Sequence, residues 1–180
     1  MTYVFHPHSS LGNTVGVTTA AAVAVCRAIE SLTDKKPQIK WVNDVCLDGK
    51  KICGILTEAI SDFETQTVTS VIIGIGMNIK TVHFPKEVEN AGNLSVDIRR
   101  ADLIAQITNE LDAVFTNKAD YISYYRTHSM ILGKHIQFIK NGIVTPATAI
   151  AIDENGGLEV RTDDGREITL TSGEISIRKG

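Results

Sequence analysis

The chain has 180 residues, of which 43% are hydrophobic and 22% are charged, and its formal net charge is −3. A chain of this length and composition can bury a core of ordinary size, which excludes a disordered or collagen-like protein. The 18 Lys and Arg residues are scattered along the sequence, so we expect no nucleic-acid interface. Cys26, Cys46 and Cys53 form no C-x-x-C pair, which predicts reduced thiols packed in the core and no disulfide framework or zinc site.

The first predicted elements are scaffold. A short strand over residues 2–5 ends before Pro7, and a helix follows from Asn13, a candidate N-cap, to Leu32 with an apolar stripe. The alanine-rich segment near residue 20 is short and has no basic leader, so we expect neither a signal peptide nor a membrane span. The expected location is the cytoplasm.

The next stretch, 39–58, carries most of the chemistry. Asp48-Gly49 lies between two apolar segments and predicts a two-residue hairpin, because Asp-Gly supplies the positive φ angles that such a turn requires. Strict alternation along the second strand places Lys51 on one face with Cys53 and Thr57. Lys51 either begins a frayed strand with its amine in water or points into a cleft where it meets an anion.

An Asn-Asp pair, Asn43 and Asp44, precedes this hairpin. Such a pair is commonly just a turn, because both side chains can bond to nearby backbone. Together with Lys40, Trp41 and Lys51, however, the pair provides two cations, an aromatic wall, an amide and a hard oxygen ligand for magnesium. This set of groups suits a nucleotide phosphate.

A buried strand is predicted over residues 68–79. Gly74 and Gly76 share one face of it, which indicates either a bulge or a place where a ligand comes close to the backbone. No helix starts after this strand, so it is not a dinucleotide-binding loop.

The remaining elements are predicted to be structural. Residues 83–96 form an irregular polar connection, and helices follow at 100–117 and 121–128. From about Met130 onward, turn dipeptides separate short alternating strands, which is typical of a small all-β barrel.

Four segments taken together resemble the biotin protein ligases, which activate biotin with ATP and transfer it to a lysine of a carboxylase. They are Lys-Trp-x-Asn-Asp at 40–44, Lys-x-x-Gly-Ile-Leu-x-Glu at 51–58, Ile-Gly-Ile-Gly-Met-Asn-Ile at 73–79 and Gly-Glu-Ile-Ser-Ile-Arg at 173–178. Val42 stands where the family usually has proline, and the family's Gly-Arg-Gly biotin loop is not found in this sequence.

The resemblance implies an α+β fold. The expected architecture is a mixed sheet with flanking helices, like that of class II aminoacyl-tRNA synthetases, followed by an SH3-like barrel. The domains would be a catalytic domain at 1–129, incomplete at its N-terminal side, and a barrel at 130–180. Homodimers that pair through sheet edges are a further expectation.

The resemblance also implies the substrates and the site. ATP with Mg²⁺ and biotin would react, and a biotin carboxyl carrier domain would accept the product; no nucleic acid or membrane is involved. Two alternatives are a non-catalytic binding protein on a ligase scaffold and a lipoate or octanoate ligase. The implied site residues are catalytic Lys51, which with Gly54, Gly74 and Gly76 binds biotin and the adenylate; Lys40, Trp41, Asn43, Asn78 and Arg178 for ATP; and Asp44 for the metal.

Overall fold

The computed structural model describes residues 1–7, 14–62, 64, 67–81, 83–86, 90–117, 120–140 and 142–177. Asn13 and Arg178, an expected helix cap and an expected ATP ligand, lie outside these residues. Within them the elements are β1 (Thr2–Phe5), α1 (Thr14–Leu32), β2 (Gln38–Lys40), β3 (Asp44–Leu47), β4 (Lys50–Asp62), β5 (Thr67–Met77), α2 (Arg100–Asn117), α3 (Tyr121–His128), β6 (His135–Lys140), β7 (Ile143–Ile152), β8 (Leu158–Thr162), β9 (Glu167–Leu170) and β10 (Glu174–Ile177).

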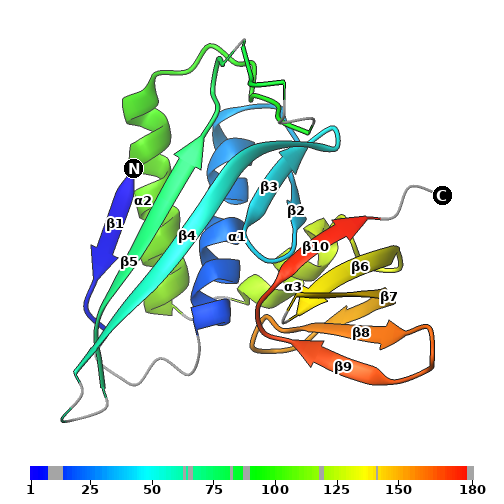
Figure 1. Ribbon diagram of the computed structural model, residues 1–180. Coiled ribbons are helices and arrows are strands. Elements are labelled where there is room, and N and C mark those ends of the chain that lie inside the picture. The colour runs from blue at the N-terminus through cyan, green and yellow to red at the C-terminus, as the bar shows by residue number, and fades with distance from the viewer. Residues whose placement is uncertain are drawn as a thin grey trace.

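The strands form two five-stranded sheets, with the orders β1-β5-β4-β3-β2 and β10-β6-β7-β8-β9 (Figure 1). Neighbouring strands in both sheets are antiparallel. Parallel pairing in the described part of the chain is confined to two isolated bridges, Ile39 with Ser129 and Lys51 with Ala91. The expected α+β fold, with a sheet, flanking helices and a small all-β unit after them, is confirmed. The expected mixed sheet is wrong in one respect, because neighbouring strands of the first sheet in the described residues are all antiparallel.

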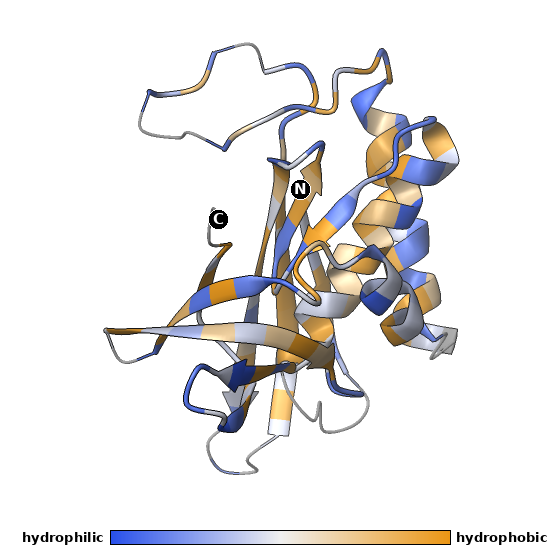
Figure 2. Cartoon of the chain, turned by 90° about the vertical axis from the view of Figure 1, so that its right-hand side faces the viewer, coloured by the Kyte–Doolittle hydropathy of each residue, from blue (hydrophilic) through white to orange (hydrophobic). Residues whose placement is uncertain are grey.

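The helices α1 and α2 cover one face of the first sheet (Figure 2). The stripe predicted for α1 understates its burial, because the helix is packed among α2, α3 and the sheet and is buried on nearly all sides from Val15 to Ile29. By length and composition alone, Val15–Leu32 could cross a membrane, but 67% of this stretch is buried inside the protein. Such burial is typical of a core helix.

The two sheets share one hydrophobic core. Ile73 and Ile75 on β5, Tyr125 on α3 and Ile136 on β6 belong to the same buried cluster, and each is at most 5% exposed. The chain crosses between the sheets at residues 129–131, where the Met130 amide donates to the Ile39 carbonyl at 2.9 Å. A division into domains at residues 129 and 130 stays a prediction.

One expectation about β4 is wrong. The pairing of β3 with β4 advances by one residue on β3, from Val45 to Cys46, but by two on β4, from Cys53 to Lys51. The extra residue, Ile52, forms a bulge, and Ile52 and Cys53 are both buried although they are consecutive. A bulge interrupts the alternation of faces. Lys51 is therefore not on the buried face with Cys53, and its side chain lies over Gly54 instead.

Candidate functional site

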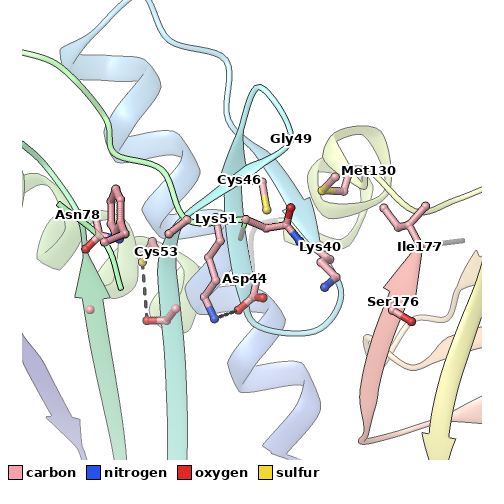
Figure 3. A pocket seen from close by; sticks show the side chains of 15 residues that line it. Lys40, Asp44, Cys46, Gly49, Lys51, Cys53, Asn78, Met130, Ser176 and Ile177 are labelled. Carbon is pink, nitrogen blue, oxygen red and sulfur yellow. Dashed lines mark hydrogen bonds and ion pairs between the residues drawn. The ribbon is translucent and has the colours of Figure 1, made fainter. Parts of the chain in front are cut away.

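A cavity of about 730 Å³ opens beside Gly54 and Gly76, on the face of the first sheet opposite the buried Ile55 and Ile75. Its walls come from β2, β3, β4 and the end of β5, from the segment after β5, and from the second sheet (Figure 3). The lining residues are Lys40, Asp44, Cys46, Gly49, Lys51, Cys53, Gly54, Gly76, Asn78, Phe84, Asn90, Ala91, Met130, Ser176 and Ile177.

The hairpin between β3 and β4 positions the charged groups of this cavity. Asp48 and Gly49 have φ angles of 51° and 76°, as the sequence predicts for this turn. The hairpin brings Lys51 Nζ to 2.5 Å from Asp44 Oδ1, and the lysine side chain is 48% exposed whereas the aspartate side chain is 18% exposed. Lys51 thus lies at the cavity with its charge balanced by one carboxylate and with about half of its side chain exposed.

Glycines form the floor beside this ion pair. Asp44, Gly54 and Gly76 are direct neighbours across β3, β4 and β5. A Cβ atom at Gly54 would lie 3.2 Å from Lys51 Cε and 3.3 Å from its Nζ, so the lysine can lie this close to β4 because this residue has no side chain. Gly74 lies on the same face of β5 opposite Leu56, outside the lining of the cavity.

The segment after β5 forms a wall that sequence reasoning missed. Residues 83–96 were predicted to be a plain connection, yet Phe84, Asn90 and Ala91 line the cavity. The Lys51 amide donates to the Asn90 carbonyl at 2.7 Å, and the Lys51 carbonyl accepts from the Gly92 amide at 2.8 Å. These bonds form the parallel bridge between Lys51 and Ala91, next to the bulge in β4. The strand propensities of the residues predict neither the bridge nor the bulge.

Asn78 connects that segment to β4. Its amide donates to the Ile52 carbonyl at 2.8 Å, and its carbonyl accepts from the Leu94 amide at 2.8 Å. The Asn78 side-chain oxygen accepts a hydrogen bond of 3.5 Å from Thr81 Oγ1. The structure therefore brings Asn78 to the cavity together with Lys51, as the sequence led us to expect.

The second sheet supplies the far wall. Ser176 and Ile177 at the end of β10, and Met130 at the crossing between the sheets, line the cavity opposite Lys40 (Figure 3). None of these three residues was a candidate from sequence. The segment 173–178 contributed to the family resemblance, but the candidate residue it offered was Arg178. Polar-apolar alternation in a short strand gives no sign of what the strand will face.

Two predicted ATP ligands do not line the cavity. Trp41 is 3% exposed, and its indole N–H donates to the Gly156 carbonyl in the second sheet at 2.9 Å. The Asn43 side-chain amide donates to the Ile55 carbonyl at 2.9 Å, and the main-chain carbonyl of Asn43 accepts from the Ile55 amide at 3.0 Å. Trp41 and Asn43 thus hold the turn between β2 and β3 from behind.

The cavity thiols are protonated in neutral solution. Burial raises the pKa of Cys46 to about 11, with a further increase from Asp44 that Lys40 and Lys51 oppose. Burial also raises the pKa of Cys53 to about 12. Because a thiol acts as a nucleophile in its ionised form, these groups pack against the site and do not react.

Comparisons with known proteins agree with this geometry. The model of the biotin/lipoate A/B protein ligase family matches residues 5–78, and that of the biotin protein ligase C-terminal domain matches residues 131–178. The bifunctional ligase/repressor BirA of Bacillus subtilis (strain 168) is 31% identical over 180 residues, covering 92% of this chain and 54% of its own length. The biotin–[acetyl-CoA-carboxylase] ligase of Mycobacterium tuberculosis is 25% identical over 169 residues, covering 87% of this chain and 60% of its own length. The chain therefore spans little more than half the length of these relatives.

A solved structure shares the fold. The biotin protein ligase from Aquifex aeolicus in complex with biotin and ATP superposes with a TM-score of 0.77 at 22% identity, covering 99% of this chain and 77% of that one. Both sheets and the helices between them therefore have counterparts in a single known architecture.

Proposed function

Since the chain belongs to the biotin protein ligase family, we propose that it activates biotin with MgATP to biotinyl-5′-adenylate and transfers the biotin to a lysine of a biotin carboxyl carrier domain. The observation that carries this proposal is the half-exposed Lys51 side chain, whose amine lies over a glycine floor at a cavity of about 730 Å³. A cation held over flat backbone suits a reaction in which two anions must approach each other.

The first step needs charge stabilisation. A biotin carboxylate oxygen attacks the α-phosphorus of ATP, the bond to the bridging oxygen breaks, and pyrophosphate leaves. Both reactants are anions, and Lys51 can donate hydrogen bonds to the carboxylate and to the α-phosphate. A cation already fixed in a partly dry cavity lowers the barrier because it needs little reorganisation as the charge redistributes.

Asp44 serves two roles in this proposal. It orients Lys51 through the 2.5 Å ion pair, and its carboxylate fits a magnesium ion, which commonly takes one or two carboxylates together with substrate phosphates. No cluster of three or more His, Cys, Asp or Glu side chains that could hold a metal occurs in the described part of the chain. A magnesium ion held by Asp44 and the phosphates would neutralise phosphate charge, while Lys40 would support the phosphate tail.

We place biotin along a row of glycines that continues from the cavity. Gly54, Gly76 and Gly74 share the uncovered face with Leu56, which is 62% exposed. A bare backbone beside an exposed apolar side chain suits a flat apolar body whose carboxylate points toward Lys51. The match of 131–178 to the biotin ligase C-terminal domain favours biotin over lipoate or octanoate.

In the second step the uncharged amine of an acceptor lysine attacks the acyl carbon of the adenylate, and AMP leaves. We expect this reaction in the cytoplasm, with a carboxylase carrier domain as acceptor. Pairing of two copies through β1, an edge strand in the described sheet with Val4 53% exposed, is part of the proposal, and sedimentation velocity at high concentration tests it.

The decisive experiment measures biotin transfer. The purified chain is incubated with biotin, MgATP and a carrier domain, and intact mass spectrometry of the carrier reports one added biotinyl group. The same reaction is repeated with a segment containing the family's Gly-Arg-Gly loop added in trans. Labelling in either reaction supports the proposal.

The matched control for this experiment is Lys51→Met, which keeps an unbranched side chain one atom shorter than lysine and removes its charge. We expect the variant to fold normally and to label the carrier at least about 100-fold more slowly than the unmodified chain. Absence of labelling by the unmodified chain, with and without the added segment, would contradict the proposal and favour a binding protein on the same scaffold.

A further inference from the structure

Trp41 is buried behind the cavity although its sequence neighbours Lys40 and Asp44 line it. It follows Lys40 and precedes Asp44 by three positions, yet it is 3% exposed and does not line the cavity. Its indole N–H donates to the carbonyl of Gly156, in the turn between β7 and β8, at 2.9 Å. This buried hydrogen bond joins the turn that carries Lys40 and Asp44 to the second sheet.

The Gly156 end of this contact is held in one orientation. Asp153 Oδ1 accepts hydrogen bonds of 2.8 Å from the amides of Asn155 and Gly157. Gly156 has a φ of +85°, and a Cβ atom there would lie 2.6 Å from Thr19 Oγ1 on α1. The turn thus fits against α1 without space for a side chain, and Asp153 fixes the direction of the carbonyl that Trp41 meets.

The turn at 41–43 is held from two further sides. Asn43 is bonded to Ile55 on β4 through its side chain and its carbonyl, as described above. The Tyr125 hydroxyl on α3 donates to the Val42 carbonyl at 3.3 Å, and Tyr125 is fully buried. Trp41 is the member of this group that reaches the second sheet.

The cavity depends on that connection because its walls come from both sheets. Lys40 and Asp44 lie on the first sheet, whereas Ser176 and Ile177 lie at the end of β10 on the second. We propose that Trp41 and Asp153 are positioning residues: through the Gly156 carbonyl they set the spacing between the two walls and thereby the affinity for nucleotide. The ligand in this inference rests on the proposed function, whereas the coupling between the walls does not.

The test uses Trp41→Phe, which keeps an aromatic ring but removes the N–H donor, and Asp153→Ala, which frees the turn without touching the cavity. The methyl resonances of Ile177 and Met130 report the far wall, and calorimetry gives the Kd for MgATP. We expect both variants to move the same methyl resonances and to raise the Kd by at most about tenfold, the limit reached if the full stabilising contribution of one hydrogen bond is passed on to the nucleotide site. The double variant should raise the Kd no more than either single variant does, because all three act through the same contact.

Asp164→Ala is the matched control. Asp164 accepts a hydrogen bond from Arg166 Nε at 2.8 Å in the β8–β9 turn of the same sheet, away from Gly156, so this variant should leave the methyl resonances and the Kd unchanged. Circular dichroism confirms that every variant is folded.

Each outcome decides something. If Trp41→Phe weakens nucleotide binding and Asp153→Ala does not, the effect of Trp41 does not pass through the Gly156 turn and the positioning role is overturned. Unchanged methyl resonances in both variants overturn it as well. If the unmodified chain binds no nucleotide while the methyl resonances respond to both variants, the coupling stands and the proposed function fails.

Discussion

The two faces of the first sheet are built from the same strands and have opposite tasks. On β5, Ile73 and Ile75 face the helices and are at most 5% exposed, whereas Gly74 and Gly76, one residue away, face the cavity side. The helix-covered face is mostly apolar and stabilises the fold; its polar side chains include Thr57, which accepts a hydrogen bond from Thr18 of α1 at 3.0 Å. The uncovered face has glycine where bulk would obstruct a ligand and a lysine where charge is needed, so function is placed where it costs the core little.

The largest expected effect tests this separation by stability. Ile73→Ala removes a fully buried side chain and should lower the free energy of unfolding by about 2–5 kcal/mol through lost burial and a residual cavity. Leu56→Ala, on the other face and 62% exposed, should change it by less than about 0.5 kcal/mol and weaken biotin binding instead. Urea denaturation of both variants gives the free energy of unfolding, and calorimetry gives the affinity for biotin. Equal losses of stability would contradict the division of tasks between the two faces.

The second prediction concerns the chemistry of the uncovered face. Lys51→Met should slow pyrophosphate release in the presence of biotin by about 100-fold or more, the usual cost of removing one group that stabilises developing charge. Lys50→Met is the control, since Lys50 is an exposed neighbour outside the cavity lining. Similar rates for the two variants would remove Lys51 from the mechanism.

A smaller effect is expected when the floor is altered but the lysine kept. In Gly54→Ala the new Cβ would lie 3.2 Å from Lys51 Cε and would displace the amine by a few tenths of an ångström. Because misplacement of a reacting group lowers the rate steeply, adenylation should slow about tenfold while the melting temperature changes little. A rate equal to that of the unmodified chain would show that Lys51 tolerates the shift.

The smallest effect is a pH dependence of stability. The raised pKa values of Cys46 and Cys53, about 11 and 12 in the folded protein, mean that the unfolded chain releases these protons first. The stabilisation is complete below about pH 8.5, the pKa of an unperturbed thiol, and is lost as the pH rises toward 11–12. From pH 7.5 to 8.5 the free energy of unfolding from urea denaturation should fall by about 1 kcal/mol or less. A Cys46→Ala, Cys53→Ala variant should show a flatter profile.

Local sequence was sufficient for most of the elements. The helices at 100–117 and 121–128 appear at the predicted residues, and the Asp48-Gly49 turn has the predicted positive φ angles. Apolar spacing and turn chemistry act within a few residues, so they can be recognised without knowing the fold. The same local information, together with the family resemblance, placed Lys40, Asp44, Lys51 and Asn78 in one site.

The tertiary structure decided which side chains face that site. The bulge at Ile52 moved Lys51 to the glycine face, and packing of the second sheet put Trp41 behind the cavity while it brought Ser176 and Ile177 into it. Pairing between distant strands and packing between sheets determine these positions, and both depend on contacts between residues far apart in the chain. The sequence by itself therefore determined the elements and the chemical groups, while long-range packing determined which of those groups meet around one cavity.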